Sequence, residues 1–295
     1  MFRTLVASSA IVAAVALSGA AAPAMAGSPE KLWEWSKAYG PESVIVDAKA
    51  GVFYVSNGNN DAMKKDGDGY ISKHSLDGKV IAEKWATGMS APKGMALVDD
   101  HLFVTDVDEL VEIDLKDGSV VAKHAAAGAK LLNDVAADSK GVVYVSDIAG
   151  QAIYKFADGK IESWMKSGPM AGPNGLVVEG DNLIVTTWGV LSGEGWATKT
   201  PGGVYSVSLS DKSITQLAGG KPVGNLDALQ PLGEGNYLLG DFWVGKILKL
   251  SADGTVSEVM ALEQGTADFG YDASTKTLVV PNMMKGTVTA YKLPE

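Results

Sequence analysis

The sequence predicts an all-β fold, a six-bladed β-propeller whose repeat is about 41 residues long. Short runs rich in Val, Ile, Tyr and Thr alternate with Gly, Asp, Asn and Pro, which is typical of short strands joined by tight turns. These runs recur in six copies, whose opening polar residues are separated by 51, 40, 41, 53 and 41 residues. Because a four-stranded propeller blade occupies roughly 40–50 residues, the spacing favours a propeller over a sandwich.

The first 26 residues are predicted to be a cleaved signal peptide. Arg3 supplies a positive charge, residues 5–22 are rich in Ala, Val and Leu, and a small-residue cleavage site ends at Ala26. The alternative is an N-terminal membrane anchor, which the weak hydrophobicity and Pro23 disfavour. We therefore expect a periplasmic or secreted protein, without membrane insertion, whose residues 27–295 form a single propeller domain.

Composition excludes several classes of function. The formal net charge of −10 argues against a surface that binds nucleic acid or anionic membranes, since both require clustered Lys and Arg. The absence of cysteine excludes disulfides, zinc–thiolate sites, thiolate nucleophiles and iron–sulfur clusters. Only three histidines are present and none opens a first strand, so a Ser-His-Asp arrangement has no support.

The six copies share one order of elements. Each begins with a first strand, continues through a Val-rich second strand, and ends with a third and a fourth strand that Asp-Gly turns often join. The first strands should line the central channel, and the polar residues that open them should point at its mouth. These residues are Glu42, Lys93, Asn133, Asn174, Asp227 and Asp268.

The two ends of the chain are expected to meet in one blade. The last copy ends near Leu293 after three strands, and residues 32–36 form an unassigned strand ahead of the first copy. The N-terminal strand should therefore close the sixth blade, which also hides a sheet edge.

Two inserts lengthen the first and fourth copies. They cover residues 57–69 and 188–202, and both fall between a second and a third strand. Because the first and fourth blades lie opposite each other in a ring of six, we expect both inserts to rise beside one mouth. Long ordered loops of this kind are usually functional. Trp188 and Trp196 are candidate walls of a substrate pocket.

The residues at the mouth suggest a cation site. Five of the six carry carboxylate or amide oxygens, and crowded carboxylates repel each other unless a cation or a proton intervenes. Ligation by oxygen alone suits a hard divalent cation, with Ca²⁺ first and Mg²⁺, Mn²⁺ or Zn²⁺ as alternatives. The other interpretation is a solvated polar channel in which Lys93 neutralises a neighbouring carboxylate.

The blade openings resemble those of the senescence marker protein/gluconolactonase family. The resemblance covers essentially the whole predicted mature chain and is carried by short motifs: Pro41-Glu42-Ser43, Leu132-Asn133-Asp134, Pro173-Asn174-Gly175-Leu176 and Asn225-Leu226-Asp227. It implies a calcium-dependent six-bladed propeller. By this resemblance, Glu42, Asn174 and Asp227 would be metal ligands. Asn133 would be a further ligand or a catalytic substrate contact, and Asp227 would double as the general base.

Two departures from the family pattern narrow the expected substrate. Lys93 brings a cation to the same mouth, where it would weaken divalent binding or contact the substrate. Arg3 is the only arginine in the chain, so a sugar acid held by a bidentate guanidinium is excluded. A neutral lactone or ester remains as the expected small-molecule partner.

Two functions follow from these residues. The first is a metal-dependent lactonase or esterase, in which Asp227 or Asp268 relays the proton beside a pocket that includes Lys93, Trp188 and Trp196. The second is a non-catalytic propeller whose mouth binds a small ligand or a partner protein, because a propeller fold does not decide function.

Overall fold

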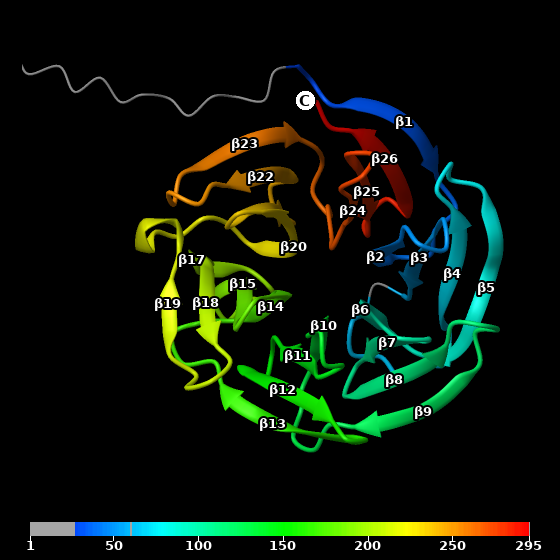
Figure 1. Cartoon of the computed structure of the whole chain (residues 1–295), viewed down its shortest axis with the longest axis horizontal. Coiled ribbons are helices and arrows are strands. Elements are labelled where there is room, and N and C mark those ends of the chain that lie inside the picture. Colours follow the sequence, from blue (N-terminus) through cyan, green and yellow to red (C-terminus); the bar gives the residue numbers. More distant parts are fainter. Residues whose placement is uncertain (1–26, 60, 295) are drawn as a thin grey trace, which may run out of the picture.

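The computed structural model describes residues 27–59 and 61–294, and almost all of its regular structure is β-strand. The predicted signal peptide, residues 1–26, lies outside the described residues. Figure 1 shows six small sheets arranged as a ring around a central axis, which confirms the predicted six-bladed propeller. In the described part of the chain, no helix is long and apolar enough to cross a membrane.

The first three blades are four-stranded antiparallel sheets in simple sequence order. The first blade contains β2 (Pro41–Asp47), β3 (Val52–Asn57), β4 (Gly69–Ser75) and β5 (Val80–Met89). The second contains β6 (Pro92–Val98), β7 (His101–Asp106), β8 (Glu109–Asp114) and β9 (Val120–Ala125). The third contains β10 (Leu132–Ala137), β11 (Val143–Asp147), β12 (Ala152–Ala157) and β13 (Lys160–Lys166).

The fourth and fifth blades keep this plan, with one hairpin added. The fourth blade contains β14 (Pro173–Glu179), β15 (Asn182–Thr187), β18 (Val204–Ser208) and β19 (Ile214–Gln216). Its insert folds as the hairpin of β16 (Gly189–Leu191) and β17 (Thr198–Pro201). A short 3-10 helix, η1 (Ala218–Gly220), follows. The fifth blade contains β20 (Leu226–Gly233), β21 (Asn236–Asp241), β22 (Lys246–Leu250) and β23 (Val256–Ala261).

The sixth blade joins the two ends of the chain, as predicted. Its sheet has the order β1-β26-β25-β24, where β1 is Glu30–Trp35, β24 Gly270–Asp272, β25 Thr277–Asn282 and β26 Thr287–Lys292. Figure 1 shows β1 on the outside of β26. Near the axis the ring is closed a second time, because the Val44 N–H donates to the carbonyl of Asp268 at 3.0 Å and the Asp268 N–H donates to that of Glu42 at 3.0 Å.

Burial explains why the second strands are the most apolar part of each repeat. A second strand has a neighbouring blade on each of its faces, so β3 and β11 are buried at every position, whereas the outer strands β9 and β13 are largely exposed. The described residues form a hydrophobic cluster between each pair of adjacent blades. The core is therefore a ring of six interfaces around a polar channel.

Candidate active site

A β-bulge opens the innermost strand of each of the first five blades. In the first blade, Pro41 pairs with Asn57 and Val44 with Val55, so two residues of β2 lie opposite one residue of β3. The same irregularity recurs in β6, β10, β14 and β20. A bulge leaves one residue out of the ladder and redirects its side chain. The first residue of each bulge is one of the predicted mouth residues: Glu42, Lys93, Asn133, Asn174 and Asp227.

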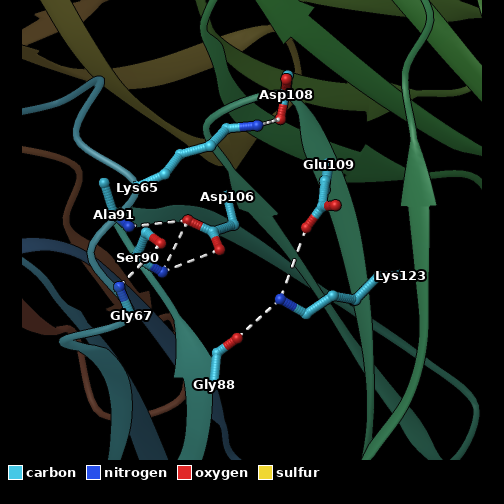
Figure 2. A network of polar contacts seen from close by, with 9 residues as sticks. All are labelled: Lys65, Gly67, Gly88, Ser90, Ala91, Asp106, Asp108, Glu109 and Lys123. Carbon is cyan, nitrogen blue, oxygen red and sulfur yellow. Dashed lines mark hydrogen bonds and ion pairs between the residues drawn. The ribbon is translucent and has the colours of Figure 1, made fainter.

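Polar residues at the ends of the second strands hold these openings in place. Asp106 accepts hydrogen bonds from the Ser90 N–H at 2.9 and 3.1 Å and from the Ala91 N–H at 2.7 Å, just ahead of the β6 bulge (Figure 2). Asp147 does the same for the N–H groups of Lys130 and Leu131 ahead of β10. Asp106 and Asp147 therefore fix the segments that lead into the β6 and β10 bulges.

The mouth of the channel is a pocket of about 450 Å³ with a polar floor and an apolar wall. We define the floor as Glu42, Lys93, Asn133, Asn174 and Asp227. We define the wall as Ala62, Leu131, Ile148, Trp188, Trp196, Phe242, Trp243, Met283 and Met284. The structure thus brings together five of the six predicted mouth residues and places Trp188 and Trp196 beside them.

Both predicted inserts reach this pocket. The first-blade insert contributes Ala62 and is tied to the second blade, because Lys65 pairs with Asp108 at 2.5 Å and the Gly67 N–H donates to the Ser90 hydroxyl at 3.2 Å (Figure 2). These contacts hold the insert beside the pocket.

The fourth-blade insert is fixed between its own blade and the next. Asn225 donates to the carbonyl of Trp188 at 2.8 Å and to the Thr198 hydroxyl at 3.0 Å. The Trp188 indole N–H donates to the carbonyl of Trp196 at 2.8 Å, and the two rings meet edge to face. The insert therefore forms a folded wall whose two tryptophans support each other.

Within residues 27–59 and 61–294, two buried oxygens on the floor find no hydrogen-bond partner: Glu42 Oε2 and Asn174 Oδ1. The Asn174 side chain is held by its amide nitrogen, which donates to the Asp227 carboxylate at 2.7 Å and to the carbonyl of Leu226 at 3.1 Å. With its N–H₂ group committed, the amide oxygen of Asn174 is left as a free acceptor. A buried acceptor without a partner is costly, so its presence at a pocket is informative.

Burial and crowding raise the pKa of the acidic groups along the channel. Burial raises the pKa of Asp227 to about 6, although the hydrogen bond from Asn174 and the charge of Lys93 both oppose the increase. Burial also raises the pKa of Glu42 well above its usual value; Lys93 opposes this, and Asp227 adds to it. Shifted acids of this kind are typical of functional sites.

Lys93 approaches this floor as a nearly buried cation. Its side chain is 4% exposed, and among the described residues its ammonium group forms no hydrogen bond or ion pair. The carboxylates of Asp106 and Asp268 bond to the Ala91 N–H and the Ser43 hydroxyl instead. Lys93 therefore acts on Glu42 and Asp227 through charge alone.

The structure does not bring Asp268 into the mouth pocket. Its carboxylate accepts a hydrogen bond from the Ser43 hydroxyl at 2.5 Å and lines a separate cavity along the inner strands, together with Asp134. Burial raises the pKa of Asp268 well above its usual value, and that of Asp134 to about 7. Asp268 is therefore less suited than Asp227 to relay a proton for a ligand at the mouth.

Sequence reasoning missed most of the apolar wall, although a signal for it exists. Ile148, Trp188, Phe242 and Met283 each follow directly after the polar residue that ends a second strand. This repeat position is apolar in five blades, the second blade having Val107 there, and it lines the pocket in the other four. Asp134 was also missed, because it is the second residue of the β10 bulge and only the first residue of each repeat opening was considered.

Comparison with known proteins supports the fold alone. No protein-family model matches the sequence, and no curated protein matches it. A gluconolactonase from Xanthomonas campestris is 14% identical with a TM-score of 0.68, and the alignment covers 94% of this chain and 98% of that one. A catalytically inactive virginiamycin B lyase from Staphylococcus aureus, solved with quinupristin, is 15% identical with a TM-score of 0.59 and coverages of 90% and 99%.

A third structure of this fold carries no assigned function. It comes from Bacteroides thetaiotaomicron, is 13% identical with a TM-score of 0.66, and covers 91% of this chain and 73% of its own. Because a gluconolactonase and a lyase both share the architecture, the chemistry of this chain has to be argued from its own pocket.

Proposed function

We propose that this protein is a divalent-cation-dependent hydrolase that opens a lactone or related ester at the floor of the mouth pocket. The observation that carries the proposal is the pair of unpartnered buried oxygens, Glu42 Oε2 and Asn174 Oδ1, on the same floor as the Asp227 carboxylate. The gluconolactonase of the same fold supports the choice of a lactone.

The donor chemistry of the floor fits a hard cation. Two carboxylates and two amides offer oxygen ligands, the set that Ca²⁺ prefers. Among the described residues, no three His, Cys, Asp or Glu side chains form a metal-binding group. The candidate site therefore depends on the amides of Asn133 and Asn174 as well as on Glu42 and Asp227. Lys93 would compete with a cation there and weaken its binding.

The residues of the floor have distinct roles in the proposed hydrolysis. A bound divalent cation would supply polarisation of the ester carbonyl and a lower pKa for water. Burial raises the pKa of Asp227 to about 6 in the cation-free protein, and a nearby cation would lower it, so the carboxylate is ionised at pH 8 and accepts a proton as a water oxygen attacks the carbonyl carbon. The ring C–O bond then breaks, and the proton passes to the released oxygen to give a hydroxy acid. Lys93 and Asn133 offer N–H donors for the developing oxyanion.

Cation binding can be tested apart from catalysis. Protein without the predicted signal peptide would be stripped with a chelator and its melting temperature followed during Ca²⁺, Mg²⁺ or Mn²⁺ titration. We expect stabilisation by mass action, about 2.7 kcal/mol at a hundredfold excess over Kd. The Glu42→Gln variant should lose the response, whereas Glu83→Gln, an exposed carboxylate on β5, should keep it. No response to any of the three ions would contradict the proposal.

Hydrolysis is then followed as acid release from neutral lactones. We expect turnover that requires the cation and falls at least about a hundredfold in Asp227→Ala, a typical effect for a general base. Unchanged turnover in this variant would remove Asp227 from the mechanism.

The second candidate function is a non-catalytic propeller that binds a ligand or partner protein at the mouth. Lys93 favours it, because an ammonium group beside Glu42 and Asp227 already supplies positive charge to the floor. This candidate predicts ligand binding that needs no divalent ion and is followed by no acid release.

A further inference from the structure

We propose that the ligand of the mouth pocket carries an apolar arm, an alkyl or aryl group attached to the lactone or ester, and that this arm lies against the pocket wall. The inference rests on the proposed function for the reacting ring, and it names the class of substrate. It excludes the hydroxyl-rich sugar lactones as preferred ligands.

The distribution of polarity in the pocket is the first argument. All five charged or amide side chains belong to the floor and come from the bulges of the innermost strands. The nine residues of the wall are all apolar or aromatic. A reacting ester on the floor would use the polar groups, so the rest of the ligand would meet hydrocarbon.

The packing of the wall is the second argument. Trp188 lies at the centre of an aromatic cluster, with ring centroids 5.5 Å from Phe242 and 6.2 Å from both Trp196 and Trp243. Its indole N–H is already bound to the carbonyl of Trp196, so Trp188 offers a ligand only apolar surface. These rings are also held by the Asn225 contacts to the insert, and a firm wall binds an apolar group without first having to become ordered.

Exposure at the rim is the third argument. Trp243 is 40% and Met284 52% exposed, although both line the pocket. Large apolar side chains left open at the edge of an otherwise apolar pocket gain free energy when a ligand covers them.

A sugar lactone would fit this pocket poorly. Each hydroxyl transferred from water to an apolar wall without a hydrogen-bond partner costs free energy, and such mismatches dominate discrimination between ligands. An alkyl arm in the same place would instead gain free energy of binding, because its apolar surface would be removed from water.

Binding of inert analogues tests the proposal without relying on turnover. The probes are 2-alkylcyclopentanones from methyl to hexyl, which keep the ring carbonyl but contain no ester bond, with calorimetric titration as the readout. We expect affinity to rise about three- to fourfold for each methylene until the wall is covered. Glucose, which has the hydroxyl groups of a sugar lactone but no ester bond, should bind more weakly than the hexyl analogue in the same titration. An affinity that does not depend on chain length would overturn the inference.

Variants of the wall complete the test. Trp243→Ala, at an exposed position that should not disturb folding, and Trp196→Ala should each flatten the dependence on chain length. Ile81→Ala, an exposed apolar residue on the outer strand β5, should leave it unchanged. An equal effect of all three substitutions would count against the wall.

Hydrolysis of the matching γ-alkyl-lactones separates the inference from the proposed function. If the affinity of the cyclopentanones rises with the length of the alkyl chain but no lactone releases acid, the result would support the apolar arm and refute the hydrolase. Acid release equally fast from γ-butyrolactone and its hexyl derivative, with flat analogue binding, would support the hydrolase and refute the arm.

Discussion

Replacing Asp227 with asparagine should stabilise the cation-free protein while abolishing its proposed function. Burial raises the pKa of Asp227 from 3.8 to about 6 in the folded protein. Ionising this carboxyl therefore costs more in the folded than in the unfolded state. Since one pKa unit corresponds to about 1.4 kcal/mol, the cost reaches about 3 kcal/mol at pH 8.

The sign of the effect follows from proton linkage. A carboxyl whose pKa is raised by folding stabilises the protein at low pH, and this contribution is lost as the pH rises from about 4 through about 6. Asparagine cannot ionise, so the variant should not lose stability in this way as the pH rises. The free energy of unfolding of Asp227→Asn should exceed that of wild type by less than about 1 kcal/mol at pH 4 and by about 3 kcal/mol at pH 8.

Thermal unfolding of chelator-stripped protein at pH 4, 5 and 8 measures this difference. A gain of about 3 kcal/mol corresponds to roughly 6 to 12 °C in melting temperature for a protein of this size. Asp181→Asn, an exposed carboxylate that forms no side-chain hydrogen bond among the described residues, is the matched control and should change little. The reasoning fails if wild type and Asp227→Asn show parallel pH profiles, or if the variant is destabilised equally at every pH.

Three further predictions concern the charge of Lys93, the hydrogen bonds that Asp147 accepts, and the closure of the ring by β1. Lys93→Met should tighten Ca²⁺ binding by at least about tenfold in calorimetric titration, because it removes a positive charge from the floor, and an unchanged Kd would show that the ammonium does not oppose the ion. Asp147→Ala leaves the N–H groups of Lys130, Leu131 and Gly150 without their acceptor, so urea unfolding should show a loss of about 2–4 kcal/mol, absent in Asp181→Ala. Deleting residues 27–38 exposes the edge of β26, and we expect a lower melting temperature and aggregation in size-exclusion chromatography; an unaltered monomer would contradict the role given to β1.

The blades and their order could be predicted because the repeat is visible in the sequence. The spacing of the opening residues gave six units, and the leftover segment at residues 32–36 indicated the closing strand that pairs with β26. The hairpin of β16 and β17 could not be read from the insert, whose strands are only three and four residues long.

The details of the site depend on register, which a single sequence does not reveal. Glu42 reaches the pocket because a bulge redirects it, and nothing in the residues 42–43 announces the extra residue. Asp268 occupies the matching repeat position, yet its carboxylate bonds to Ser43 instead. A shift of one residue in strand register moves a side chain to the other face of the sheet. The repeat spacing does not reveal such a shift, and it therefore predicted that Glu42 and Asp268 would both lie at the mouth.

The recurring bulge separates the architecture of this protein from its chemistry. Strand pairing resumes normal register directly after each two-residue bulge, as with Val44 in the first blade and Val135 in the third. Exchanging the bulged side chain therefore leaves the apolar interfaces between blades as they were. Each of the first five blades offers the channel one position whose side chain can be exchanged independently of the others. Lys93 illustrates this independence, because it places an ammonium group in one blade while the other four bulges keep carboxylates or amides.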